Sequence, residues 1–356
     1  MKLSKISLIL AAVFALTGCV EKEIIDDVNI EMGVGYDVSE EGEKIEGTVM
    51  IPIFNPDKNI GNFTFSATAE SNRDLIQEVQ RKSAQPLVTG SLEIAIFGEK
   101  IARKGLRQFI DAYERDASIG ARIYFAVADD KAKEILNGTY GNRGNAVHLS
   151  QLIKHNTESR NLPVTNMHLF LFNLYQEGKD PYLPILKKVE PEIVDIVGIA
   201  IFKDEKMVEE LPPDKMFFFK LLTDKFSEGS FNLELEGEKV SIKDLNSKHK
   251  MKVTKRNPHK VTVEIKIEGL VREYTGKTLS PDVVKKIEKE LEAIVNKETT
   301  AMIKDFQEKG IDPIGFGQFI KTKTRGFDFK RWEDEYKNLT VDVKTNVVIT
   351  EVGIVE

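Results

Sequence analysis

Few residues of this chain are able to carry out covalent or metal chemistry. Its 356 residues include one cysteine and five histidines, and the histidines are His148, His155, His168, His249 and His259. These histidines do not follow the spacing of metal ligands, and we expect structural roles for them. The sequence lacks a phosphate-binding Gly-x-x-x-x-Gly-Lys-Ser/Thr loop, a His-Glu-x-x-His zinc motif and a Gly-x-Ser-x-Gly nucleophile turn. We therefore predict no catalytic residues, no cofactor and no metal site, which excludes the common enzyme classes.

Two glycine pairs could in principle approach a phosphate. The first, Gly33-Val34-Gly35, lacks the third glycine and the following helix of a dinucleotide site, so we expect strand packing or a bend. The second, Gly315-Phe316-Gly317, predicts a backbone turn. Neighbouring charges such as Glu158 with Arg160, or Glu114-Arg115-Asp116, are expected in a chain with 30% charged residues and predict local ion pairs or solvated faces.

Two aromatic features have both a functional and a structural interpretation. Trp332 lies beside Arg331 and near Tyr336, and it could stack on a sugar or pack the last strand onto a long helix. The run Phe217 to Phe219 could form a partner surface or part of the core. We favour the structural interpretation in both cases.

The only cysteine, Cys19, follows a short basic start at Lys2 and Lys5 and an uncharged apolar run from Ile6 to Leu16. This order is typical of an export signal, and the run is well short of the ~20 residues of a membrane-spanning helix. The sequence Leu-Thr-Gly-Cys resembles the lipobox of bacterial lipoproteins, which implies diacylglyceryl transfer to the thiol and cleavage before Cys19. A plain secretory signal with a chance cysteine is the alternative.

Removal of residues 1–18 would change the formal charge from −6 to −8, because Lys2 and Lys5 are lost. An acidic protein is a poor partner for nucleic acid. With 41% hydrophobic residues the chain has the composition of a globular protein, and its length predicts two or three cores. After Cys19 no apolar stretch approaches the length needed to cross a bilayer.

The N-terminal half alternates predicted strands and helices. Strands are expected at 28–38, 45–54, 92–98 and 121–129, a helix is expected after Ser71, and a second helical pattern covers 100–116. Strand, helix and strand in that order predict a helix packed on a sheet. Residues 137–145 contain three glycines and three asparagines and predict a loop. Pro181, Pro184 and Pro191 predict a crossing between domains.

The C-terminal half begins with a strand at 193–202, a turn at 203–206 and a short helix around Phe217. An alternating strand over 261–267 precedes the longest helix, which Ser280-Pro281 opens and Gly310 closes after about 29 residues. A terminal strand begins at Leu339. We therefore predict an α+β protein with a signal peptide at 1–18, a lipidated tether at 19–27 and three mixed α/β domains at 28–190, 191–255 and 256–356.

The order of these segments resembles the Ger(x)C family, the C-subunit lipoproteins of bacterial spore nutrient germinant receptors. The resemblance covers essentially the whole chain: the Cys19 motif, then EMGVGYDV, IFGEKIARKGLRQFIDAYERD, VGIAIFKDEKMVEEL, and DPIGFGQF with Trp332. Two departures are Val20-Glu21, where the family often has Trp-Asp, and Glu209-Glu210, where a smaller or aromatic residue is expected.

The resemblance implies a non-enzymatic subunit of three α/β domains, fixed by lipid to the outer face of the spore inner membrane. It also implies a polytopic A subunit and a transporter-like B subunit as partners in nutrient-triggered germination, whereas nutrient binding by the C subunit itself is left open. The alternative is a substrate-binding lipoprotein of an importer, which requires two similar lobes around a cleft. The unlike N- and C-terminal patterns argue against that alternative.

Overall fold

The computed structural model describes residues 27–42, 44–56, 58–120, 122–256 and 258–352. The signal segment, Cys19 and almost all of the tether predicted at 19–27 lie outside these residues. The helices are α2 (Asn72–Lys82), α3 (Glu99–Lys104), α4 (Arg107–Arg115), α5 (Ala132–Leu136), α6 (Asn145–Ser159), α7 (Met167–Tyr175), α8 (Pro213–Thr223), α9 (Pro281–Lys309), α10 (Phe316–Lys323) and α11 (Phe329–Lys337).

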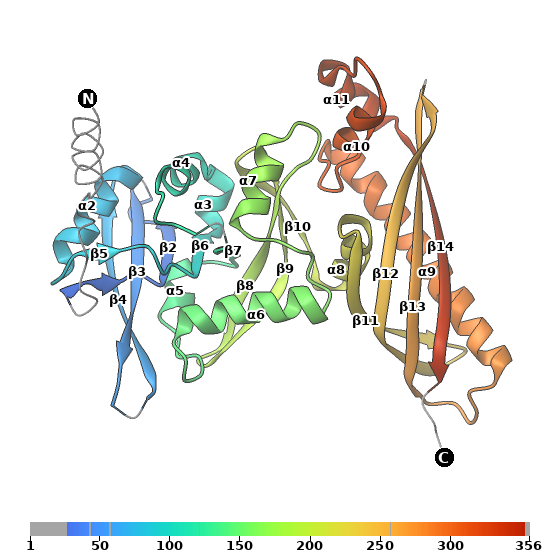
Figure 1. Ribbon diagram of the computed structural model, residues 1–356, viewed down its shortest axis with the longest axis horizontal. Coiled ribbons are helices and arrows are strands. Elements are labelled where there is room, and N and C mark those ends of the chain that lie inside the picture. The colour runs from blue at the N-terminus through green and yellow to red at the C-terminus, as the bar shows by residue number, and fades with distance from the viewer. Residues whose placement is uncertain (1–26, 43, 57, 121, 257, 353–356) are drawn as a thin grey trace, which may run out of the picture.

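The described strands form three sheets, and their mixture with helices confirms the predicted α+β class. The strands are β1 (Asn29–Ile30), β2 (Gly33–Val38), β3 (Ile45–Phe54), β4 (Ile60–Ala69), β5 (Leu87–Val88), β6 (Ile94–Gly98), β7 (Tyr124–Ala128), β8 (Tyr182–Glu190), β9 (Ile193–Lys203), β10 (Lys206–Leu211), β11 (Phe226–Leu235), β12 (Glu238–Arg256), β13 (His259–Tyr274) and β14 (Thr340–Val352). The molecule is elongated, with β4 toward one end and β14 toward the other (Figure 1).

The largest sheet has eight strands in the order β10-β9-β8-β7-β6-β2-β3-β4. Its centre is parallel, from β2 through β6 and β7 to β8, and its outer strands are antiparallel. Alternate residues of β6 face opposite cores, since Ala95 and Phe97 pack with α2, α3, α4 and α7 whereas Ile94 and Ile96 pack with α5, α6 and α8. The sheet is therefore covered on both faces, as near-continuous apolar strands such as β6 require.

The C-terminal sheet has the order β11-β12-β13-β14, and α9 packs along it. The predicted limits of α9 are confirmed: Ser280 caps its start by accepting a hydrogen bond from the Val283 N–H, and Gly310 ends it in the left-handed region with φ 67°. The edge strand β14 donates the Val347 and Ile349 N–H groups to Glu292 and Glu288 of α9. These side chains occupy an edge that would otherwise be free to pair.

Two local predictions were wrong. The helical pattern over 100–116 is interrupted at Gly105, whose φ of 124° ends α3 before α4 begins. The segment with the three prolines forms a strand, β8, rather than a crossing. Pro181 and Pro191 flank this strand, and Pro184 lies within it. Pairing of β8 with β7 covers only Ile185 and Leu186, so the missing N–H of Pro184 interrupts no ladder on that side.

The division into domains at 190 and 255 stays a prediction. Residues 191–255 contribute β9 and β10 to the eight-stranded sheet and β11 and β12 to the C-terminal sheet. We refer below to the eight-stranded sheet with its helices as the N-terminal body, and to β11–β14 with α9–α11 as the C-terminal body.

Candidate functional site

The predicted lipidation residue, Cys19, lies outside the described residues, so its modification stays a prediction. The five histidines are not gathered together: His155 and His168 are exposed, while His249 and His259 bond to the Asp224 carbonyl and the Glu335 carboxylate. In the described part of the chain, no group of three or more His, Cys, Asp or Glu side chains could hold a metal ion. Across the same residues, no helix combines the length and apolar character needed to cross a membrane.

Both glycine pairs have packing roles. A Cβ at Gly33 would lie 2.5 Å from the terminal methyl of Met50, and one at Gly35 would lie 3.0 Å from the Cβ of Ala132, so β2 carries glycine where neighbouring side chains pack closely. Gly315 has a φ of 87° and forms the turn before α10, as predicted. Position 317 has no room for a side chain, because a Cβ at Gly317 would lie 2.4 Å from Nε1 of Trp332.

Both aromatic features are buried, as the structural interpretation requires, but Trp332 does not have the predicted partners. Phe217, Phe218 and Phe219 are buried in α8. Trp332 is 4% exposed, so it presents no face for stacking on a sugar. It packs against Tyr336 and Phe327, with ring centroids 5.6 and 5.5 Å away, and thus fixes α11 against the α10 segment rather than β14 against α9.

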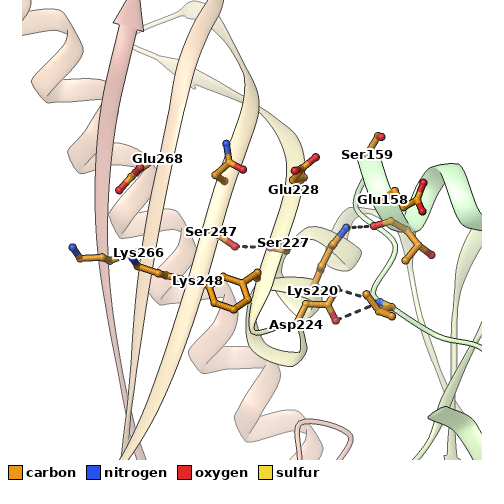
Figure 2. Close-up of a pocket in the computed structure, with 14 residues that line it drawn as sticks. Glu158, Ser159, Lys220, Asp224, Ser227, Glu228, Ser247, Lys248, Lys266 and Glu268 are labelled. Carbon is orange, nitrogen blue, oxygen red and sulfur yellow. Dashed lines mark hydrogen bonds between the residues drawn. The ribbon is translucent and has the colours of Figure 1, made fainter. Parts of the chain in front are cut away.

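A groove of about 590 Å³ lies between the end of α6, the end of α8 and strands β11 to β13 (Figure 2). It lies at the junction of the N-terminal and C-terminal bodies. Two buried charged residues, Lys220 and Asp224, lie on its α8 side, and sequence analysis selected neither. The only signal for Lys220 is a lysine within the apolar run FFFKLL, which marks a buried cation needing partners.

Lys220 fixes the end of α6. Its side chain is 2% exposed, and Nζ donates hydrogen bonds of 2.7 and 2.6 Å to the carbonyls of Thr157 and Arg160. Burial lowers the pKa of Lys220, and the negative charges of Asp224 and Glu228 oppose that effect. The ammonium group thus satisfies carbonyls that the last turn of a helix leaves without intrahelical partners.

Asp224, which follows α8 directly, holds the segment after α6 in the same way. Its carboxylate accepts hydrogen bonds from the Val164 N–H at 3.1 and 3.3 Å, and its carbonyl bonds to Nδ1 of His249 at 3.0 Å. Burial raises the pKa of Asp224 to about 6, although the charge of Lys220 lowers it. The two buried charged groups of the groove therefore hold backbone in place.

The rim of the groove is charged. Lys248 of β12 and Lys266 of β13 are exposed and stand directly opposite each other, with Glu228 and Glu268 in the adjoining rows. Phe226 is 68% exposed at the same rim. Opposed lysines repel, and an exposed phenylalanine gains from burial, so these features suit contact with another molecule better than isolation. Glu158, which also lines the groove, forms no ion pair with Arg160 in the described structure. Glu114 accepts a hydrogen bond from the Tyr175 hydroxyl, which joins α4 to the end of α7 rather than forming a local ion pair.

A second buried polar cluster joins the two bodies at the segment DPIGFGQF. The carboxylate of Asp312 accepts hydrogen bonds from the N–H groups of Gly315, Phe316 and Gly317 at 2.8, 3.0 and 2.8 Å. Its own N–H donates to the Asp180 carboxylate at 2.6 Å, and the Asp180 N–H donates back to the Asp312 carbonyl at 2.9 Å. Burial raises the pKa of Asp312 to about 7, opposed by the backbone N–H groups. This cluster is a structural latch, which we call the Asp312 latch.

The residues Glu209 and Glu210, which depart from the family pattern, lie in strand β10. Glu209 forms an ion pair with Lys309 of α9 at 2.8 Å and so joins the two bodies, and Glu210 pairs with Arg103 of α3. Both contacts are thus made by carboxylates in this chain.

Comparison with known proteins agrees with the resemblance. A model described as the spore germination protein N-terminal domain matches residues 21–188, and one described as spore germination B3/GerAC like, C-terminal, matches residues 197–353. Together they cover most of the chain, which therefore belongs to the Ger(x)C family of spore germination proteins.

Individual relatives extend over nearly the full length. The spore germination protein GerQC of Bacillus cereus is 32% identical over 348 residues, which cover 96% of each chain. The spore germination protein KC of Bacillus subtilis is 22% identical, with 98% of this chain and 95% of that protein covered. A crystal structure of the GerBC protein has the same fold, with a TM-score of 0.59, 15% identity, and coverage of 90% of this chain and 97% of that one.

Proposed function

We propose that this chain is the C subunit of a spore germinant receptor, a non-enzymatic lipoprotein needed for nutrient-triggered germination. The observation that carries the proposal is the match of both family domains in order along the chain, at 21–188 and 197–353. The full-length similarity to GerQC supports it. Its partners are then the integral-membrane A and B subunits of the receptor.

The membrane anchor of the proposed subunit is diacylglyceryl on Cys19. The support is sequence: one cysteine, placed at the end of an apolar run and after Leu-Thr-Gly. Burial of a methylene contributes about 0.8 kcal/mol, and one acyl chain alone holds a protein only marginally, so two chains give durable attachment. The protein is then located on the outer face of the spore inner membrane.

A non-catalytic role is supported by the groups in the groove, because Lys220 and Asp224 are occupied in holding α6 and the Val164 segment. A lipid at one end confines the body to the surface and raises its effective concentration for the membrane subunits. The charged rim with Phe226 is then available to another subunit, and nutrient recognition is not assigned to this chain.

The test is affinity purification of the tagged full-length protein from detergent-solubilised spore inner membranes, with mass spectrometry of its partners and of its N-terminal peptide. Two integral-membrane partners and a diacylglyceryl mass on Cys19 are expected. Copurification of an importer, or of no membrane protein, would contradict receptor membership while leaving the anchor to be judged from the peptide mass.

A further inference from the structure

The β3–β4 hairpin extends beyond the rest of the N-terminal body (Figure 1). Three large apolar side chains near its end are exposed: Phe54 by 69%, Phe63 by 52% and Ile53 by 44%. We call these three residues the hairpin tip. Isolated exposed apolar residues are common, but three on one projecting element form a patch that requires an explanation.

Two residues of the hairpin tip, Ile53 and Phe63, continue a core face beyond the helices that cover it. Ile51, at 9% exposure, belongs to the core beneath α2 to α4, and it is paired with Phe63 across the hairpin. Ile53 is two residues further along the same face, and its partner Gly61 has no side chain with which to cover it. Phe54 follows Ile53 directly and therefore lies on the other face, at the end of β3. Both faces at the end of the hairpin thus carry apolar side chains that the described residues leave exposed.

The opposite face of the hairpin is braced by the glycine-rich loop at 137–145. The Asn145 N–H donates to the Asn62 side chain at 2.9 Å, the Thr64 hydroxyl donates to Asn137 at 2.6 Å, and the Ile60 N–H donates to the Asn142 carbonyl at 3.1 Å. A braced hairpin loses little freedom when its tip is buried, which favours binding.

The charged residues that the structure describes around the tip are basic. Among the described residues of 52–63 and 139–145, the charged side chains are Lys58 and Arg143, and both are exposed. The sequence adds Asp57, which lies outside the described residues. Aromatic and aliphatic side chains flanked by basic groups are typical of protein surfaces that enter the headgroup region of an anionic bilayer.

The length of chain between Cys19 and the body places a membrane within reach of this tip. Val28 is nine residue steps from Cys19, which span at most about 30 Å when extended. The Met32 N–H bonds to the Met50 carbonyl at 3.0 Å, and Phe54 is four residue steps from Met50 along β3. Four steps along a strand span about 13 Å, so the tip is close enough to touch the surface that holds Cys19.

We propose that the hairpin tip inserts into the interfacial region of the bilayer beside the lipid anchor, as a second membrane contact. This inference rests on the proposed anchor at Cys19, and it adds an orientation: the end of the N-terminal body with β3 and β4 lies on the membrane. The short tether favours a lipid surface over a second copy of the chain as the occupant.

The test uses the full-length lipidated protein in vesicles of phosphatidylethanolamine and phosphatidylglycerol. Phe54→Cys supplies a thiol for an environment-sensitive fluorophore, since Cys19 is blocked by its thioether. Val348→Cys on β14 is the matched control, because Val348 is 42% exposed and β14 lies at the other end of the molecule (Figure 1). A blue-shifted emission at 54, with quenching by nitroxide lipids several times that at 348, is expected.

The outcomes separate this inference from the anchor. Equal, weak quenching at both positions in protein that floats with vesicles and carries diacylglyceryl would overturn the hairpin contact alone. Protein that neither floats nor carries the lipid mass would contradict the anchor and the inference together. Shielding of position 54 only in membranes that contain the other receptor subunits would assign the tip to a protein partner and also overturn the lipid contact.

Discussion

The Asp312 latch predicts an unusual dependence of stability on pH. Burial raises the pKa of the Asp312 carboxyl from an ordinary value of 3.8 to about 7. The folded protein therefore keeps this proton up to about pH 7, whereas the unfolded chain releases it near pH 4. Because the folded state binds more protons in that window, the contribution of Asp312 to stability is fully present below about pH 4 and is lost as the pH rises to about 7.

The size of the effect follows from the same values. Each pH unit between the unfolded and folded pKa changes the free energy of unfolding by about 1.4 kcal/mol, which gives about 4 kcal/mol over the whole window. Asp312→Asn removes the titration. It also leaves one oxygen to accept from three N–H groups, so the amide costs about 1–3 kcal/mol at low pH through unsatisfied donors.

The two effects give the variant a distinctive profile. Asp312→Asn should be less stable than the parent protein near pH 4, and the two stabilities should cross between about pH 4.5 and 6. Near pH 8 the variant should be the more stable of the two, because the parent loses about 4 kcal/mol over the window whereas the amide costs about 1–3 kcal/mol. Urea unfolding at several pH values measures this, with the fluorescence of Trp332 as a local probe, because Trp332 packs against the latch at Gly317. A difference that stays constant, or a variant that is still the less stable at pH 8, would refute the reasoning, because the three N–H groups would then be holding the carboxylate ionised.

Two controls locate the effect. Asp328→Asn makes the same change at an exposed N-cap of α11, whose side chain accepts from the Lys330 N–H at 3.0 Å, and it controls for loss of the carboxylate charge at a capping position that is not buried. Asp180→Asn removes the neighbouring carboxylate whose charge raises the pKa of Asp312. It should therefore shift the pH window of the parent profile to lower values.

Three further predictions concern single residues. Cys19→Ala should leave the body folded and remove the protein from the membrane fraction in high salt, as fractionation and immunoblotting of spore membranes would show; retention would contradict a lipid-only anchor. Gly315→Ala should cost about 1 kcal/mol because its φ is 87°, whereas Gly317→Ala should cost about 1–3 kcal/mol because its Cβ would lie 2.4 Å from Nε1 of Trp332; equal thermal unfolding of both variants and the parent would refute these assignments. Lys220→Met should cost about 1–3 kcal/mol by leaving two buried carbonyls without a donor, measured by urea unfolding, and an unchanged midpoint would show that water replaces the ammonium group.

The elements that were predicted well are those whose limits are determined by their own residues. The limits of α9 follow from a capping serine, a proline in the first turn and a terminal glycine, all of which act locally. Strand β3 was predicted with the limits that the structure has, since its apolar residues alternate and its ends are marked by turn residues. In contrast, β12 went unpredicted because seven of its 19 residues are lysine or arginine, and its pairing with β13 stabilises a strand that local propensity disfavours.

The buried polar sites could not be predicted because their hydrogen-bond partners are distant in the sequence. Asp180 and Asp312 are 132 residues apart, and the sequence around each of them does not indicate that they form a hydrogen bond. The one local clue is an aspartate three residues before Gly315, a spacing that suits a side chain capping the N–H groups of a following turn. Lys220 and Asp224 gave even less signal, because their partners are backbone groups of α6 and of the segment that follows it.

The Asp312 latch is a stronger polar contact between the two bodies than the ion pair at their surface, and both contacts lie beside a hydrophobic core that the bodies share. The Glu209–Lys309 pair has side chains that are 26% and 40% exposed, and pairs of that kind contribute about 0–1 kcal/mol. The latch places a reciprocal pair of hydrogen bonds between Asp180 and Asp312 in a buried setting, where each unmade bond costs about 1–3 kcal/mol. The departure from the family pattern at Glu209 therefore alters the surface of this junction, whereas the buried latch lies in DPIGFGQF.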